Sequence, residues 1–154
     1  MRGLSATLDR NEAEPKVGDA LPPLWHWLYF LPHTRQSEIG PDGHASKGGF
    51  LPPVPLPRRM WAGSRFEWHS PISVGDTIQR TSSVQSVQHK VGKSGDLVFV
   101  KVLHELRNGA QLCLSEEHDI VYKSAPLENE VAAQPMPAAK LLVPELALWQ
   151  REIV

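Results

Sequence analysis

The clearest pattern in the chain is an alternation of apolar and polar residues in its second half, which is typical of half-buried strands. Phe66 and Trp68 alternate with polar neighbours, and the segment around Leu97 to Leu103 carries apolar residues on both faces. Such a strand is expected at the centre of a sheet, because both of its faces need cover. The pattern predicts strands at residues 65–69, 77–87, 97–106 and 110–123.

The connections between these strands predict an antiparallel arrangement. Asn108-Gly109 is a favoured pair for a two-residue type I′ hairpin turn, so the last strand is expected to return beside the third. A glycine-bearing connection at 91–95 joins the second strand to the third. An antiparallel meander with a helix against one face, an α+β fold, is therefore expected.

The first 57 residues predict little regular structure. Leu4 and Leu8 are one helical turn apart, which favours the end of a helix within residues 1–10. More than half of the fourteen prolines lie in residues 21–57, so only residues 25–31 are expected to form a regular element there. The aromatic content of this segment indicates that it covers a surface rather than standing free.

Composition narrows the function classes. Sixteen basic and seventeen acidic residues give a net charge of −1, which supplies no reason to expect nucleic acid or an anionic membrane as a partner. The single cysteine, Cys113, excludes an internal disulfide and is expected to be a small buried residue. No apolar run approaches the length of a membrane span, so a soluble cytoplasmic protein is expected.

Two short motifs are set aside. Gly92-Lys93-Ser94 has the last residues of a phosphate-binding loop, but the glycine required five positions earlier is Val87. The run from Glu116 to Asp119 has metal-binding side chains, but alternate residues of a strand point to opposite faces. A solvated strand face is the expected role of that run, and no metal site is expected.

Several blocks of sequence resemble a known family. Residues 21–31 read LPPLWHWLYFL, and residues 48–63 read GGFLPPVPLPRRMWAG. Similarity continues in HSPI at 69–72, VGDT at 74–77, KSGDLVFV at 93–100, LSEE at 114–117 and DIVY at 119–122. Together they resemble the N-terminal half of MaoC-like hydratases and dehydratases, the group around itaconyl-CoA and mesaconyl-CoA hydratases.

That resemblance implies a hot-dog fold, a sheet wrapped around a helix, over residues 1–123 without the family's opening strand. Residues 124–154 are then expected to be a linker and a short C-terminal helix. The resemblance also implies an acyl-CoA thioester held between two hot-dog units, as a homodimer or with a catalytic MaoC-like subunit. No cofactor is expected, because coenzyme A is part of the substrate.

The catalytic residues have to be sought from the chemistry that the family performs. Hydration of an enoyl thioester needs a base for water, an acid for the α-carbon and donors for the thioester oxygen. The family's Asp and His pair lies in its second half, and its motif is not found in this chain. Asp42 and His44 are candidates on the proline-rich loop, and the alternative for His44 is a solvated loop histidine. His26 is a further candidate, and its alternative is a packed, hydrogen-bonded histidine.

Binding residues can be predicted more directly. Arg58 and Arg59 follow a stiff proline run and are candidates for binding CoA phosphates or a substrate carboxylate, with an ion pair as the alternative. Gly48 and Gly49 allow a ligand to approach the backbone, although a plain turn also explains them. An acyl or pantetheine channel has as candidate lining residues Trp25, Phe50, Met60 and Trp61. The alternative for these four side chains is packing in the core.

Three functions remain open. The first is a hydro-lyase unit that hydrates a short enoyl-CoA, including a dicarboxylic one, alone or with a partner. The second is a catalytically silent acyl-CoA-binding subunit that completes the site of a separate catalytic half. The third and weakest is a hot-dog thioesterase, because one fold hosts both reactions.

Overall fold

The computed structural model describes residues 1–11, 13, 15–40, 42–92 and 95–125. The predicted linker and C-terminal helix beyond residue 125 lie outside this part of the chain, so the predicted division at residue 123 stays a prediction. The elements are α1 (Arg2–Thr7), the 3₁₀ helices η1 (Trp25–Tyr29) and η2 (Gln36–Glu38), and the strands β1 (Arg58–Trp68), β2 (Ile78–Gly92), β3 (Gly95–Asn108) and β4 (Gln111–Lys123).

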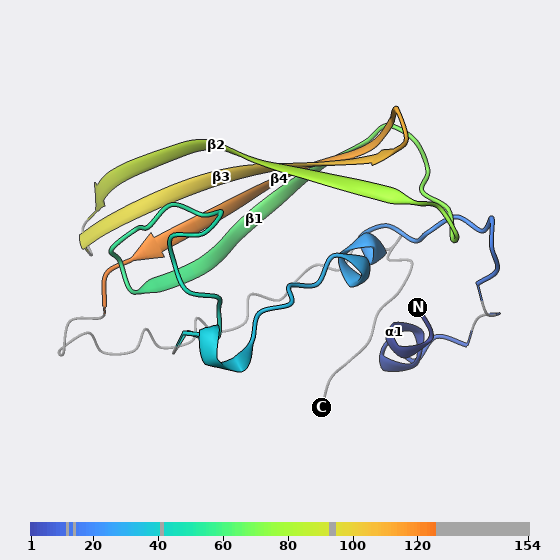
Figure 1. The fold of residues 1–154 in the computed structure, drawn as a ribbon, viewed down its shortest axis with the longest axis horizontal. Helices are drawn as coiled ribbons and strands as arrows, with labels where there is room; N and C mark the ends of the chain where they lie inside the picture. Colours follow the sequence, from blue (N-terminus) through green and yellow to red (C-terminus); the bar gives the residue numbers. More distant parts are fainter. Residues whose placement is uncertain (12, 14, 41, 93–94, 126–154) are drawn as a thin grey trace, which may run out of the picture.

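The four strands form one antiparallel sheet in the order β1-β4-β3-β2 (Figure 1). The predicted antiparallel sheet, the α+β class and the central position of the third strand are confirmed. The prediction of a simple meander is wrong for β1, which pairs with β4 rather than with β2. The connection from β1 to β2 contains Pro71 and crosses the end of the sheet instead of forming a tight hairpin.

The hairpin between β3 and β4 has the predicted two-residue loop, shifted by one position. Asn108 pairs with Gln111 and belongs to β3, so the loop consists of Gly109 and Ala110. Gly109 has a φ of +56°, a left-handed conformation that glycine adopts without steric cost. A register shift after Leu106 brings Cys113 into a bulge, where it is buried as expected.

One face of the curved sheet is covered by residues 20–40 and 42–57 (Figure 1). This segment is irregular apart from η1 and η2, as the prolines predict. The element that lies against the sheet is the five-residue η1 rather than a long helix, because Pro22, Pro23 and Pro32 bracket the region. In the described part of the chain, none of the helices has the length and apolar character needed to span a bilayer.

The core on the covered face consists of two separate apolar clusters. One contains Val54, Val100, Val102, Ile120 and Tyr122, with Leu51 and Leu56 of the proline-rich segment packed against it. The other contains Ile72, Leu106, Cys113 and Leu114, with Leu21 and Phe30 packed against it. The covering segment is thus fixed to the sheet at both ends, and the space between the clusters holds the candidate site.

Candidate functional site

A polar strip crosses the covered face of the sheet between the two apolar clusters. On β4, Glu116 and His118 lie between apolar residues of the same face, because alternate residues of a strand share a face. His104 of β3 lies opposite Glu116 in the register. The strip, called the polar belt below, consists of Ser64, Ser82, His104, Glu116 and His118.

Glu116 is the most buried member of the polar belt, with 4% of its surface exposed. Nε1 of Trp27 donates to its Oε2 at 3.1 Å, and Oγ of Ser64 donates to its Oε1 at 3.2 Å. Nε2 of His26 lies 3.5 Å from Oε2. Burial works against the charged form, but the contacts from His26 and Trp27 outweigh it and lower the pKa of Glu116 below its ordinary value. The carboxylate is therefore ionised at neutral pH.

The expectation that Glu116 belongs to a solvated strand face is wrong. The segment that carries η1 covers this face of β4, so the indole of Trp27 replaces water as a donor to the carboxylate. Glu117, its neighbour, does lie on an exposed face, where Nε of Arg65 and Nζ of Lys101 contact it at 2.6 and 3.2 Å. The predicted split of this run between two faces is confirmed.

His26 is packed as expected but is not hydrogen-bonded as expected. Its exposed fraction is 3%, and its ring lies 5.8 to 6.3 Å from the rings of Trp27, Phe66 and Trp68. Within the described residues, neither ring nitrogen makes a hydrogen bond, so the 3.5 Å approach of Nε2 to Glu116 is its main polar contact. His26 is thus a second residue of η1, beside Trp27, that contacts the carboxylate.

The two other histidines of the polar belt retain unused ring nitrogens. His104 Nδ1 lies 2.7 Å from Oγ of Ser82, and burial lowers the pKa of His104, with the charge of Glu116 opposing that shift. The rings of His104 and His118 are 5.9 Å apart. Among the described residues, no hydrogen bond reaches His118, although a neutral imidazole has both a donor and an acceptor nitrogen.

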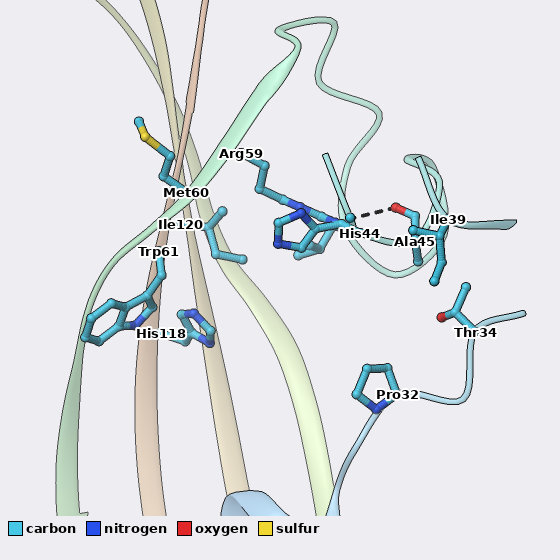
Figure 2. Close-up of a pocket in the computed structure, with 12 residues that line it drawn as sticks. Pro32, Thr34, Ile39, His44, Ala45, Arg59, Met60, Trp61, His118 and Ile120 are labelled. Atoms are coloured by element: carbon cyan, nitrogen blue, oxygen red, sulfur yellow. Dashed lines mark hydrogen bonds between the residues drawn. The ribbon is translucent and has the colours of Figure 1, made fainter. Parts of the chain in front are cut away.

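Two cavities open beside the polar belt and share Pro32, Trp61 and His118. The belt cavity, of about 430 Å³, is lined by Trp27, Phe30, Leu31, Pro32, Trp61, Arg80, His104, Glu116 and His118. The loop cavity, of about 420 Å³, is lined by Pro32, Thr34, Ile39, Gly43, His44, Ala45, Leu51, Arg59, Met60, Trp61, His118 and Ile120 (Figure 2). The shared residues make them neighbouring parts of one groove.

Four of the residues predicted from sequence gather at the loop cavity: His44, Arg59, Met60 and Trp61. Figure 2 shows Arg59 extending from β1 towards the loop that carries His44 and Ala45. Its Nη2 donates to the carbonyl of Ala45 at 3.5 Å. Trp61 donates from Nε1 to Ser64 of the polar belt at 3.2 Å, so it links the two cavities.

Asp42 and His44 form a local pair at the rim of this cavity. The backbone N–H of His44 donates to Oδ1 of Asp42 at 3.2 Å, and Nδ1 of His44 lies 3.4 Å from Oδ2. The N–H of His44 lowers the pKa of Asp42, with smaller contributions from the charges of His44 and Arg59. Half of the His44 side chain is exposed.

The other predicted residues lie away from both cavities. Arg58 is the neighbour of Arg59 on β1 and has the opposite orientation, since alternate strand residues point to opposite faces. Trp25 is buried, with the guanidinium of Arg10 5.4 Å from its ring centroid. Gly48, Gly49 and Phe50 line neither cavity, and Phe50 is 56% exposed.

The polar belt was missed by sequence reasoning, although β4 carries a signal for it. Leu114, Ile120 and Tyr122 define an apolar face with a period of two, and Glu116 and His118 occupy that same face. A charged residue on the apolar face of a strand needs buried partners. In the described ranges, no group of three or more His, Cys, Asp or Glu side chains is placed to hold a metal ion.

Comparison with known proteins gives three findings. The profile of the family described as "Hydroxyacyl-thioester dehydratase type 2" matches residues 24–147. A mesaconyl-C(4)-CoA hydratase of Chloroflexus aurantiacus is 44% identical over 119 residues, which cover 77% of this chain and 42% of that protein. A chain in the crystal structure of the ChsH1-ChsH2 complex from Mycobacterium tuberculosis superposes with a TM-score of 0.41 at 13% identity, covering 45% of this chain and 41% of that one.

Proposed function

This chain belongs to the hydroxyacyl-thioester dehydratase type 2 family, and on that premise we propose that it binds short-chain CoA thioesters for hydration or dehydration of their acyl group. The proposal includes short dicarboxylic acyl groups, since the relative from Chloroflexus is named a mesaconyl-C(4)-CoA hydratase. Coenzyme A enters as part of the substrate, and no further cofactor is proposed. We place the protein in the cytoplasm, a compartment that suits its single free cysteine.

The observation that carries this proposal is the groove formed by the belt and loop cavities. Each cavity has a volume within the range of small-molecule sites, about 300–1,000 Å³. Aromatic and aliphatic side chains such as Phe30, Leu31 and Trp61 form the walls of the belt cavity, and the polar belt forms its floor. A short acyl group fits the belt cavity, and the pantetheine arm follows the loop cavity past Trp61.

Arg59 is the proposed contact for the phosphates of coenzyme A. Within the described residues, its Nε atom is buried without a hydrogen-bond acceptor, and Ala45 accepts its Nη2 only at 3.5 Å. A guanidinium has five donors in a planar fork that suits phosphate oxygens. Lys47 adds a second cation at this end of the groove, 5.8 Å from the ring of Tyr122, which pairs with Arg59 across the strands.

The chemistry that the chain supplies by itself is limited by the state of Glu116. Both of its oxygens already accept hydrogen bonds, so the carboxylate is a fixed charge rather than a free base. Among the described residues, His104 and His118 line the belt cavity with ring nitrogens that make no hydrogen bond. The Asp42 and His44 pair stays a candidate for proton transfer, because His44 lines the loop cavity and contacts Asp42.

A second candidate function is a binding subunit without catalytic residues of its own. The chain spans less than half the length of the relative from Chloroflexus, at 42%. In the described part of the chain, β1 and β2 are the outer strands of the sheet, and such edges favour pairing with a second copy or with a catalytic MaoC-like chain. In that case the groove binds the thioester, and the partner supplies the acid and base.

The test is an assay of the purified 154-residue chain with crotonyl-CoA, mesaconyl-CoA and itaconyl-CoA, followed by loss of the enoyl absorbance. Each substrate is tested with and without the protein encoded by the adjacent gene, and butyryl-CoA binding is measured by calorimetry in parallel. Turnover by the chain alone contradicts the binding-subunit alternative. Absence of both binding and turnover, with or without the partner, overturns the proposed function.

Arg59→Ala, with Arg58→Ala as the matched control, tests the CoA contact. Loss of charged hydrogen bonds is expected to weaken butyryl-CoA binding by about ten- to a hundredfold for Arg59→Ala. The neighbouring arginine lines neither cavity, so Arg58→Ala is expected to bind as the wild type does. Equal affinities for the two variants would show that the phosphates bind elsewhere.

A further inference from the structure

His104 and His118 form a pair of imidazoles on the floor of the belt cavity. They lie on adjacent strands, β3 and β4, with their ring centroids 5.9 Å apart, and both line that cavity. Ser82 occupies only Nδ1 of His104, which leaves Nε2 without a partner among the described residues. In the same part of the chain, the ring of His118 receives no hydrogen bond at all.

The two histidines differ in this respect from Glu116, the third titratable residue on the floor of the belt cavity. Glu116 is satisfied by Trp27 and Ser64, so it has a structural explanation. An imidazole that is partly removed from water on an apolar face loses hydrogen bonds unless something replaces them. The two unused imidazoles face a cavity with apolar walls, which is where a ligand's polar atom can satisfy them.

The chemistry of the pair favours a neutral oxygen that both donates and accepts. Burial lowers the pKa of His104, so its ring is neutral at neutral pH and carries one donor and one acceptor nitrogen. The ionised Glu116 lies opposite His104 in the register and disfavours a second anion at this place. The guanidinium of Arg80 lies at the wall of the cavity, where it contacts the ring of Phe30 at 4.8 Å.

We propose that His104 and His118 bind the acyl hydroxyl of a 3-hydroxyacyl thioester and so distinguish it from the saturated acyl thioester. The hydroxyl donates to one imidazole and accepts from the other, and the rest of a short acyl chain contacts Phe30 and Leu31. This inference rests on the proposed function, because it assumes that the acyl group enters the belt cavity. It assigns these two histidines to ligand specificity.

The test compares the dissociation constants of 3-hydroxybutyryl-CoA and butyryl-CoA, measured by calorimetry on the 154-residue chain alone and with the partner chain. A net hydrogen bond to a neutral group is expected to make the hydroxylated ligand bind about three- to tenfold more tightly. His118→Ala is expected to abolish this preference, measured as the ratio of the two dissociation constants, whatever its effect on the affinity for either thioester. A far-UV circular dichroism spectrum and a urea midpoint like those of the wild type show that the variant is folded.

Two further variants make the result specific. His104→Gln retains an amide that can hydrogen-bond, so it is expected to keep part of the preference for the hydroxylated ligand. His89→Ala is the control, because His89 pairs with Asp96 at an exposed position outside the cavity and its loss is expected to change neither constant.

The outcomes separate the two levels of the proposal. If the wild type binds both thioesters equally, or if His118→Ala keeps the preference, the hydroxyl subsite is wrong and the thioester groove stands. If neither thioester binds to the chain, alone or with its partner, the proposed function fails and the subsite fails with it.

Discussion

Glu116 and Glu117 are adjacent in the sequence but lie on opposite faces of the same sheet. Glu116 is covered by η1 and accepts hydrogen bonds from Trp27 and Ser64, with only 4% of its surface exposed. Glu117 forms ion pairs with Arg65 and Lys101 on the open face, where its side chain is 39% exposed. A single step along a strand thus separates a fixed buried charge from a solvated ion pair.

The difference shows how the covering segment, rather than the strand itself, determines what a carboxylate can do. On the open face water competes for every contact, so ion pairs contribute little stability. On the covered face no water replaces the donors of Trp27 and Ser64, so without them the carboxylate would be charged and unpaired in an apolar interior. Its hydrogen bonds are therefore required for the fold. Glu116 is tolerated on this face because η1 brings an indole donor to the sheet.

The largest expected effect comes from removing the buried carboxylate. Glu116→Ala leaves the Trp27 indole and the Ser64 hydroxyl without their acceptor, which is expected to lower the free energy of unfolding by about 2–4 kcal/mol. Glu117→Ala removes only exposed contacts and is expected to cause a much smaller loss. Urea unfolding followed by tryptophan fluorescence measures both variants, and similar losses would contradict the distinction between the faces.

An intermediate effect is expected in the acid range. The pKa of Glu116 is lower in the folded chain, so this carboxyl contributes stability above its unfolded pKa of about 4.3. That contribution is lost as the pH falls below this value and through the folded pKa. Glu116→Gln should therefore make the free energy of unfolding less dependent on pH in this range than it is in the wild type.

Glu117→Gln is the matched comparison for the acid range. The contacts of Arg65 and then Lys101 lower the pKa of Glu117 too, so the sign of its contribution is the same. Solvent screens these contacts, so a smaller flattening of the pH dependence is expected than for Glu116→Gln. Equal curves for the two variants across the acid range would mean that the contacts of Glu116 on the covered face favour its charged form no more than the exposed contacts of Glu117 do.

Much of the sheet could be predicted from sequence because strand periodicity is a local property. The four strands follow from alternating residues such as Phe66 and Trp68, and the two-residue loop after Asn108 follows from turn chemistry. The pairing of β1 with β4 could not be predicted in this way. It depends on a crossing connection through Pro71, and periodicity does not specify which strands become neighbours.

The candidate site was predicted only in its loop part. Arg59, Met60 and Trp61 follow a proline run, lie at the start of β1 and do line a cavity. Glu116 was missed because its donor is Trp27, 89 residues away along the chain. A charged residue on the apolar face of β4 was a local signal, but the donor that makes it tolerable is a tertiary contact.

The smallest expected effect is on the open face, at Arg65. Its guanidinium contacts Glu117 at 2.6 Å and Asp119 at 2.9 Å, but its side chain is 57% exposed. Arg65→Ala is expected to shift the urea midpoint only slightly at low salt, because solvent screens both contacts. In about 1 M NaCl, where the Debye length is about 3 Å, the shift should disappear, whereas the effect of Glu116→Ala should persist. A salt-independent loss in Arg65→Ala would mean that the face carrying Glu117 is covered in solution, because a covered contact is shielded from the dissolved ions.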